Sequence, residues 1–254
     1  MSEIKVDNVH KSFGKLKVLQ GIDFELKKGE GAILLGSNGC GKSTLMRSIC
    51  GLTPIDSGEI FIKSQSMQKA SRKSVMQMRT NVGVVFQKFN LVSNLSVFQN
   101  VLYGAMGSSK FGLLSCIASF ASSENRDKAM ACLERVKLAD KASAKAEELS
   151  GGQQQRVAIA RMLMQDPEVV LADEPIASLD PKSGKEVMEL LWEVVSEKNL
   201  SVICTLHQLD IALEYGDRFI GLKEGKVMID KDKNSVDKEL LQQLYQTQKV
   251  AEYA

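Results

Sequence analysis

The first thirty residues alternate between hydrophobic and polar positions, as half-buried strands do. The apolar positions in this stretch are Ile4, Val6, Val18, Ile22, Phe24 and Leu26. Turns are expected near Gly14 and Gly21, because glycine adopts turn conformations at little steric cost. The alternation therefore predicts paired strands at the start of the chain.

A different pattern begins at residue 32. The continuous apolar run over residues 32–35 predicts a strand that is buried on both faces. A glycine-rich turn over residues 36–41 follows it. A helix is then expected from about residue 42 to residue 50, where Gly51 ends it.

Short apolar runs recur along the chain and predict further strands, over residues 59–62, 82–86, 169–172 and 201–204. A helix between the last two carries one apolar stripe, formed by Val187, Leu190, Leu191, Val194 and Val195. Runs on either side of Glu224 and Gly225 predict a hairpin. A final helix is expected to carry Leu240, Leu241, Leu244 and Tyr245. Strand, crossover helix and strand in succession indicate an α/β fold with a mainly parallel sheet.

Strand patterns disappear from about residue 90 to residue 145, and residues 125–138 show helical spacing instead. This stretch is interpreted as a mostly helical insertion. We expect one domain over residues 1–254. Its parts are a core over 1–88 and 161–230, a helical part over 89–160 and a C-terminal helix over 231–254.

Composition is that of an ordinary globular protein, with 44% hydrophobic and 25% charged residues among 254. The formal charge of +2 is too balanced for a sequence-independent nucleic-acid binder, so no nucleic-acid partner is expected. Five widely spaced cysteines without a C-x-x-C pair fit a reducing cytosol better than a disulfide framework or a zinc site. The most apolar stretch, residues 111–120, is half the roughly 20 residues of a spanning helix.

Residues 36–44, GSNGCGKST, match the phosphate-binding pattern G-x-x-x-x-G-K-[ST]. Glycines let the backbone curl so that its N–H groups point at phosphate oxygens, and the next helix directs its positive end at the same oxygens. Lys42 adds a mobile positive charge, and the Ser43 hydroxyl can ligate Mg²⁺. The alternative is a plain turn between a strand and a helix. The strand before the loop and the helix after it favour the phosphate site.

Two adjacent carboxylates, Asp173 and Glu174, end the apolar run over residues 169–172. Open α/β sheets place ligands at this end of their strands. Adjacent residues on a strand point apart, so two different roles are expected. Asp173 would hold Mg²⁺ through water, and Glu174 would act as general base on the attacking water. The alternative is a carboxylate pair that caps a turn before Pro175.

The string LSGGQQQR at residues 149–156 places Ser150, Gly151 and Gly152 at the start of a helix. The free amides of that helix start, together with a hydroxyl, form a second anion cradle. One lysine loop and one spare cradle suggest a head-to-tail dimer, in which each cradle covers the nucleotide of the other subunit. The alternative to an anion cradle is an ordinary serine N-cap followed by glycines.

Taken in order, GSNGCGKST, Gln87 after VGVVF, LSGGQQQR, VVLADEP, Ser178-Leu179-Asp180 and His207 resemble the ABC transporter ATPases. The resemblance covers about residues 3–230. It implies a P-loop NTPase fold of the ABC type: a mainly parallel sheet core, an N-terminal antiparallel β subdomain and an inserted helical subdomain. It also implies a homodimer that holds two ATP molecules, with Mg²⁺, at its interface.

The same resemblance implies roles for individual residues. Phe13 would stack on adenine, Gln87 would contact Mg²⁺ and sense the membrane partner, and His207 would contact the γ-phosphate. The implied catalytic set is Lys42, Gln87, Glu174 and His207. The implied ATP contacts are Phe13, Val18, Gly36, Ser37, Asn38, Gly39, Cys40, Gly41, Lys42, Ser43 and Thr44. The implied contacts with the partner's ATP are Leu149, Ser150, Gly151, Gly152 and Gln153, the dimer loop holds Ser178 and Asp180, and the implied Mg²⁺ ligands are Ser43, Gln87 and Asp173.

Three of these residues could instead have purely structural roles. Phe13 could belong to the core, Gln87 could be an ordinary hydrogen-bonding loop residue, and His207 could be a core histidine at the end of a buried strand.

Several stretches, among them ADEPIASLDP and DIALEYGDRFIGLKEGKV, resemble the phosphonate-importer branch of the family. That resemblance implies two transmembrane permease subunits as partners, a periplasmic or lipid-anchored solute-binding protein beyond them, and a place on the cytoplasmic face of the membrane. Phosphite importers use closely similar ATPases. The alternatives are the ATPase of an importer for polar amino acids or methionine, and a non-transport ABC ATPase that drives a membrane-anchored partner.

Overall fold

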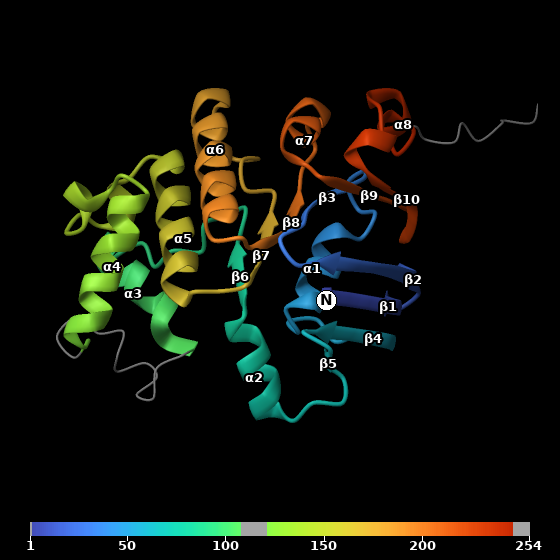
Figure 1. Ribbon diagram of the computed structural model, residues 1–254, viewed down its shortest axis with the longest axis horizontal. Coiled ribbons are helices and arrows are strands. Elements are labelled where there is room, and N and C mark those ends of the chain that lie inside the picture. Colours follow the sequence, from blue (N-terminus) through green and yellow to red (C-terminus); the bar gives the residue numbers. More distant parts are fainter. Residues whose placement is uncertain (1, 108–120, 246–254) are drawn as a thin grey trace, which may run out of the picture.

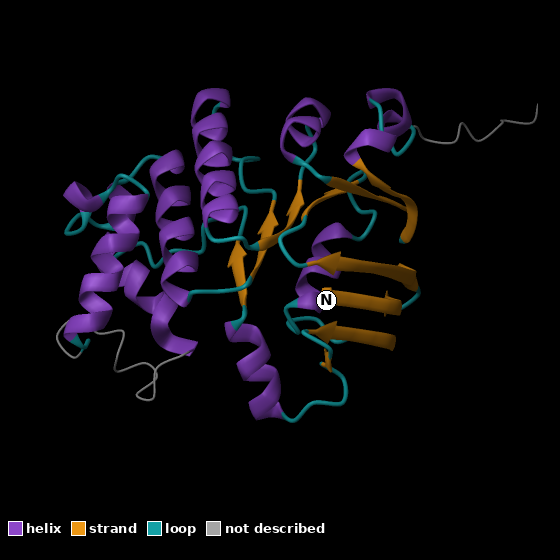
Figure 2. Cartoon of the chain, in the orientation of Figure 1, coloured by secondary structure: helices purple, strands orange, loops and turns teal. Residues whose placement is uncertain are grey.

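Two β-sheets lie side by side at the centre of the computed structural model, which describes residues 2–107 and 121–245 (Figures 1 and 2). The larger sheet has the strand order β10-β9-β3-β8-β7-β6. Its strands are β3 (Gly31–Leu35), β6 (Val82–Val85), β7 (Val169–Asp173), β8 (Ser201–Thr205), β9 (Arg218–Lys223) and β10 (Lys226–Asp232). Every neighbouring pair is parallel except the hairpin of β9 and β10. The sequence-based prediction of a mainly parallel α/β sheet is confirmed.

The smaller sheet is antiparallel, with the order β2-β1-β4-β5. Its strands are β1 (Ser2–Phe13), β2 (Leu16–Lys27), β4 (Ser57–Ile62) and β5 (Gln65–Ser66). The alternating apolar residues of β1 and β2, such as Ile4 and Ile22, form one buried cluster with Leu45 and Ile49 of α1 (Lys42–Ile49). The same cluster takes in Ile203 of β8, so α1 packs against both sheets and ties them together.

Helices α5 (Gly151–Gln165), α6 (Pro181–Glu197), α7 (Leu209–Tyr215) and α8 (Lys238–Gln242) lie along the larger sheet, and α3 (Val97–Leu102) and α4 (Ser123–Arg135) pack against α5 on the side away from it (Figure 1). Short 3₁₀ segments join them at Tyr103–Gly107, Ala139–Lys141, Ala146–Glu148 and Lys233–Ser235. The apolar stripe of α6 is buried in the same cluster as α3, α4 and α5. Trp192 of α6 donates its indole N–H to the carbonyl of Tyr215 at the end of α7, at 2.8 Å.

Two predictions about local structure need correction. Gly21 lies inside β2 rather than in a turn. The pairing of β1 with β2 shifts register at this position, and Gly21 adopts the positive φ, +76°, that this bulge requires. Helix α2 (Arg72–Thr80) was not expected, because its only buried residue is Met78 and its sequence lacks an apolar stripe. It begins at Ser71, whose side chain accepts a hydrogen bond from the Ser74 amide.

The boundaries expected for the C-terminal helix and for the helical part also differ from those of the elements in the structure. Strand β10 continues to Asp232, so the structure begins the last helix at Lys238 and not near residue 231. The expected boundary between residues 160 and 161 falls inside α5, because its buried face continues from Val157 to Met164 without a break. The apolar run over residues 111–120 lies outside the described residues. Among the helices of the described part, none is long and apolar enough to cross a membrane.

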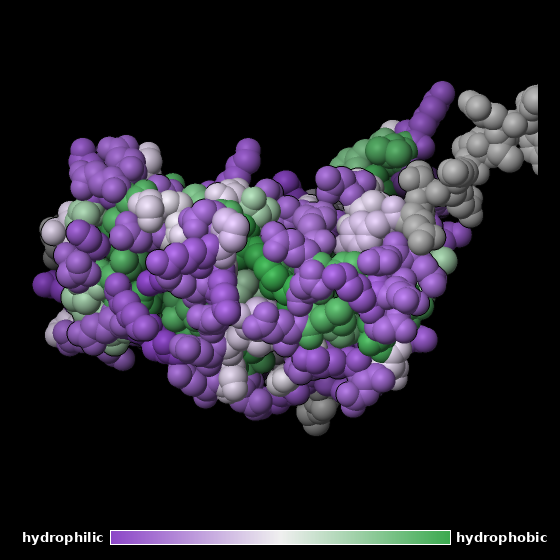
Figure 3. Space-filling view, turned by 90° about the horizontal axis from the view of Figure 1, so that it is seen from above, coloured by the Kyte–Doolittle hydropathy of each residue, from purple (hydrophilic) through white to green (hydrophobic). Residues whose placement is uncertain are grey.

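Hydrophilic residues dominate the face seen from above Figure 1, and hydrophobic residues show in strips among them and at one edge (Figure 3). Several large hydrophobic side chains elsewhere are exposed: Phe13, Leu16, Leu52, Met76, Val92, Met106 and Met228. Three of these, Leu52, Val92 and Met106, line a single groove, which is described below.

Candidate functional site

The glycine-rich loop joins β3 to α1 and is closed on itself by Lys42. The Lys42 side chain is only 5% exposed and donates to the carbonyls of Gly36, at 2.7 Å, and Ser37, at 3.2 Å. Helix α1 starts at once after Gly41, whose left-handed φ of +112° turns the chain. The ammonium group is therefore held against the backbone of the loop, at its centre.

Two glycines of this loop have no room for a side chain. A Cβ on Gly36 would lie 2.2 Å from the Leu222 carbonyl oxygen and 2.7 Å from the Cys40 sulfur. A Cβ on Gly41 would lie 2.8 Å from the Val18 carbonyl oxygen. Both positions also have positive φ, which glycine adopts without penalty. Cys40 is buried, and its sulfur lies on the inside of the turn beside Gly36.

A cavity of about 190 Å³ opens over the loop. It is lined by Val18, Asn38, Gly39, Gly41, Lys42, Ser43, Thr44 and Glu174. The structure thus brings Glu174 to the loop from a strand more than 130 residues further along the chain. Phe13 does not line this cavity; it ends β1 with its side chain 53% exposed, so it is not a core residue.

The two carboxylates at the end of β7 lie in different environments. Thr205, at the end of β8, donates its hydroxyl to Asp173 Oδ1 at 2.9 Å. The same hydroxyl oxygen accepts the backbone N–H of Glu174 at 2.7 Å. Glu174 itself has a left-handed φ of +48°, which turns it away from the strand. Thr205 is fully buried and therefore fixes the backbone that carries both acids.

His207 follows β8 and meets Glu174 directly. Its Nε2 lies 2.6 Å from Glu174 Oε1. His207 itself does not line the cavity; Glu174 connects it to that site. Asp173 and Gln87 are not among the residues that line it, and Gln87 is exposed just after β6.

The second cradle is the start of α5. Ser150 caps the helix in a capping box: its hydroxyl accepts from the Gln153 amide, and its own amide donates to Gln153 Oε1 at 3.0 Å. Ser150 is exposed, whereas Leu149 is buried. No residue of this cradle lines the cavity over the lysine loop of the same chain. The two anion-binding features are therefore separate within one chain.

Gly151 and Gly152 pack closely against the segment that follows Glu174. A Cβ on Gly151 would meet Leu179 at 3.2 Å, and one on Gly152 would meet Ser183 at 3.0 Å. Asp180 caps α6 by accepting the Ser183 amide at 3.0 Å. Hydrogen bonding from Ser183 holds the pKa of Asp180 below its usual range. Ser178 is exposed on the same turn.

Sequence reasoning missed two residues that contact the site. Thr205 ends an apolar strand. It is recognised as a structural partner of Asp173 and Glu174 only when the position of that strand is known, because its hydroxyl is then seen to be fully buried and bonded to both. Tyr245 was assigned to a helix, yet its hydroxyl accepts the backbone N–H of Gly36 at 3.4 Å. No local pattern connects residues 36 and 245, so this contact could not be foreseen.

Comparisons with known proteins agree on the family. The family model described as ABC transporter matches residues 19–177. A phosphonates import ATP-binding protein PhnC of Staphylococcus aureus is 44% identical over 96% of this chain and 95% of its own length. A second protein of that name, from Oceanobacillus iheyensis, is 41% identical over 96% of each chain.

Solved structures show the same fold. A nucleotide-free ATP-binding cassette from an ABC transporter has a TM-score of 0.83 at 27% identity, and the match covers 98% of this chain and 100% of the other. The cassette MJ0796, in a dimeric post-hydrolysis state with ADP and phosphate, has a TM-score of 0.77 at 33% identity, over 91% and 98% of the two chains. With its lysine loop, paired carboxylates and LSGGQ helix on this fold, the chain belongs to the ABC transporter family of ATPases.

Proposed function

We propose that this chain is the ATP-hydrolysing subunit of an importer for phosphonates or a related phosphorus oxyanion such as phosphite. Relatives named phosphonates import ATP-binding proteins match almost the whole chain, at 41–44% identity. The observation that carries the ATPase assignment is that Lys42 and Glu174 line one cavity, with His207 hydrogen-bonded to Glu174. A positive charge for phosphate and a base for water thus lie together.

Each residue at the cavity has a role in this proposal. Lys42 and the amides of the glycine-rich loop neutralise the β- and γ-phosphates of ATP. Glu174 takes a proton from the attacking water, and His207 fixes the orientation of that carboxylate and contacts the γ-phosphate. The ring of Phe13, exposed at the end of β1 in the smaller sheet, stacks on adenine.

Magnesium fits the donor set of the site. Ser43 supplies a hydroxyl inside the cavity, and Asp173 supplies a carboxylate at the adjacent strand end. Gln87 would complete the set from its exposed loop. When bound, Mg²⁺ neutralises charge that develops on the phosphates. Hard oxygen ligands together with substrate phosphates are the environment that this ion prefers.

The separation of the two anion-binding features supports a homodimer. Ser150, Gly151 and Gly152 lie away from the lysine loop of their own chain and are free to cover the ATP held by a second copy. Ser178 and Asp180 lie on the turn next to them and would contact that copy as well. Hydrolysis then requires closure of two subunits, because only the closed dimer surrounds the γ-phosphate.

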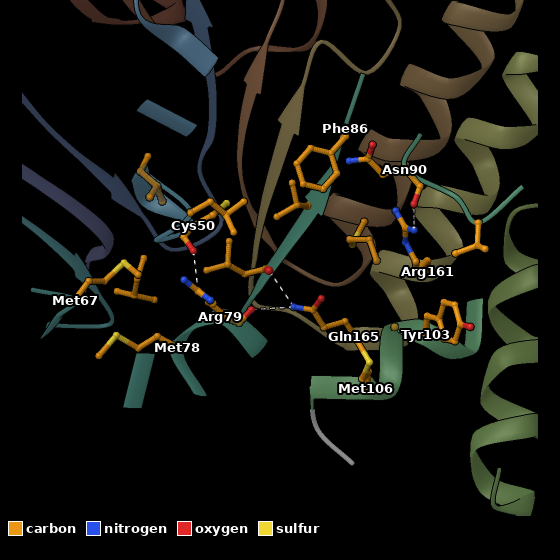
Figure 4. Close-up of a pocket in the computed structure, with 18 residues that line it drawn as sticks. Cys50, Met67, Met78, Arg79, Phe86, Asn90, Tyr103, Met106, Arg161 and Gln165 are labelled. Carbon is orange, nitrogen blue, oxygen red and sulfur yellow. Dashed lines mark hydrogen bonds between the residues drawn. The ribbon is translucent and has the colours of Figure 1, made fainter. Parts of the chain in front are cut away.

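We place the docking site for the permease in a groove of about 460 Å³ (Figure 4). It lies between α1 and β6 on one side and α5 and the Tyr103–Gly107 turn on the other. Figure 4 shows Met67, Met78 and Met106 around it, with Phe86 and Asn90 from the loop that contains Gln87. Unbranched, polarizable methionines adapt to the shape of a bound helix. A short amphipathic helix from the cytoplasmic side of each permease subunit fits this lining.

Docking is tested with exposed residues of the groove. Leu52→Asp and Val92→Asp each place a charge on the apolar wall, where Leu52 is 50% and Val92 is 40% exposed. Both variants are expected to lose co-purification with the permease subunits at the membrane. Met228→Asp is the matched control, because Met228 is exposed on β10 and does not line the groove. Retention of the permease by both groove variants would refute the docking proposal.

The solute is tested on the binding protein encoded beside this chain. Calorimetry with methylphosphonate, phosphite and phosphate should give tight binding of one phosphorus oxyanion. Binding of methionine or a polar amino acid instead would reassign the transporter while leaving the ATPase proposal intact. A chain with no permease or binding protein encoded nearby would favour the non-transport alternative.

A further inference from the structure

One side chain inside the molecule contacts the loops on both sides of the catalytic centre. Gln155, on the second turn of α5, is completely buried. Its Nε2 donates to the carbonyl of Pro175 at 2.8 Å and lies 3.4 Å from the carbonyl of Phe86. Both acceptors are carbonyl oxygens, so the amide nitrogen must face them, and this fixes the orientation of the side chain.

These two carbonyls belong to the residues adjacent to proposed functional groups. Phe86 immediately precedes Gln87, and Pro175 immediately follows Glu174. The two loops come from different strands, β6 and β7. The Gln155 amide therefore joins the backbone that carries the water-activating carboxylate to the backbone that carries a proposed Mg²⁺ ligand.

The helix that carries Gln155 also carries the second anion cradle. Ser150, the cap of α5, is five residues before Gln155, about 7.5 Å along the axis at the rise of an α-helix. Further along the same helix, Arg161 donates to the carbonyls of Phe89 and Asn90, at 2.9 and 2.6 Å. Helix α5 thus holds the Gln87 loop at both ends.

The acceptor side of the same amide is unused. Gln155 Oε1 is buried and has no hydrogen-bond partner among the residues that the structure describes. Buried amide oxygens are normally paired. The long 3.4 Å contact to Phe86 and the free Oε1 leave this link incompletely formed in the single chain, whereas the 2.8 Å bond to Pro175 is complete.

We infer that Gln155 is a positioning residue that couples the two nucleotide sites of the dimer. This inference rests on the proposed function. The cradle at Ser150 faces the ATP of the partner subunit, whereas Gln87 and Glu174 act on the ATP of their own chain. When α5 moves to cover the partner's nucleotide, Gln155 carries the loops of its own active site with it. Each site is completed only when the other one is filled.

The test replaces the amide by an apolar side chain of similar size. With the dimer in its complete transporter, Gln155→Leu should lower kcat about tenfold, leave the KM for ATP within about twofold, and reduce the Hill coefficient toward 1. Gln155→Glu presents oxygen to both carbonyls and should have the same defects. Gln154→Leu is the matched control, because among the described residues Gln154 Nε2 donates to Leu149 at the start of its own helix, at 3.0 Å, and to neither loop. It should keep the wild-type Hill coefficient.

Several outcomes are decisive. An unchanged Hill coefficient in Gln155→Leu overturns the coupling role, and so does an equal loss in Gln154→Leu. A wild-type protein that hydrolyses ATP without cooperativity, as a monomer, overturns the proposed function itself.

A second experiment needs no change at Gln155 and covers the case in which its variants do not fold. A mixed dimer contains one wild-type chain and one Lys42→Ala chain. The Lys42→Ala chain holds no ATP on its own lysine loop and contacts ATP only through its cradle, which covers the nucleotide of the wild-type chain. Hydrogen exchange at residues 87–90 and 176–180 of the Lys42→Ala chain should slow when ATP is added. Unchanged exchange at both loops would overturn the inference.

Discussion

His207 Nε2 lies 2.6 Å from Glu174 Oε1, and this contact joins the ends of two neighbouring parallel strands, β8 and β7. Thr205 makes a second connection between the same strand ends through its hydroxyl. The carboxylate that faces the lysine loop is therefore held both through its side chain and through its backbone. A fixed orientation of this kind suits the general-base role that we propose for Glu174.

Replacing Glu174 tests the base directly. Glu174→Gln keeps the size of the side chain and its hydrogen bonding, but it removes the basic oxygen. We expect ATP binding to persist, hydrolysis to fall about 10²–10⁴-fold, and the ATP-bound dimer to accumulate. Phosphate release and size-exclusion chromatography measure these effects. Normal turnover would show that another group activates the water.

His207 can be compared with the other histidine of the chain. His207→Ala removes the partner of Glu174 and a proposed phosphate contact, so kcat should fall about 10²-fold or more. His10→Ala is the control, because His10 lies on the small sheet and contacts the Asn8 side chain at 3.0 Å. Its turnover should match the wild type. Equal loss in both variants would point to a structural effect.

Ser150→Arg tests whether the cradle acts across the dimer. The added side chain blocks the start of α5, which does not line the lysine-loop cavity of its own chain. Monomeric ATP binding should be unchanged, while hydrolysis is abolished. Fluorescent-nucleotide titration and a phosphate assay separate the two. Loss of binding by the monomer would contradict the role across the dimer.

Cys50 provides a prediction about pH and stability. Burial raises the pKa of its thiol to about 12 in the folded protein, against about 8.5 in an unfolded chain. A raised pKa means that the unfolded state loses its proton first. The stability from this group is therefore complete below about pH 8.5 and declines above it, by up to about 1.4 kcal/mol per pH unit. Urea unfolding from pH 8 to 10.5 should show a shallower decline for Cys50→Ala than for the wild type. Equal slopes would contradict the prediction.

The sequence predicted most of the fold because the strands are continuous apolar runs bounded by turn residues. The runs at residues 32–35, 169–172 and 201–204 all became fully buried central strands. Helix α2 could not be predicted this way, since a mostly exposed helix has no apolar stripe to reveal it. Gly21 was mistaken for a turn because positive φ serves a bulge within a strand as well as it serves a turn.

The turn of the glycine-rich loop and the helix cap at Ser150 were predictable, because each uses contiguous residues. Partners brought in by tertiary structure were not. Thr205 reaches Asp173 from the neighbouring strand β8, and Gln155 reaches Phe86 from 69 residues away. Residue type gives no indication of such contacts until the strand order is known.

The hydrogen bond from Trp192 to the end of α7 has a practical consequence. It is the chain's single tryptophan, and it lies on the helix that Asp180 caps. Intrinsic fluorescence excited at the indole therefore comes from one known place, without a dye or label. A change in emission as ATP is added would report a rearrangement around α6 and α7 in real time.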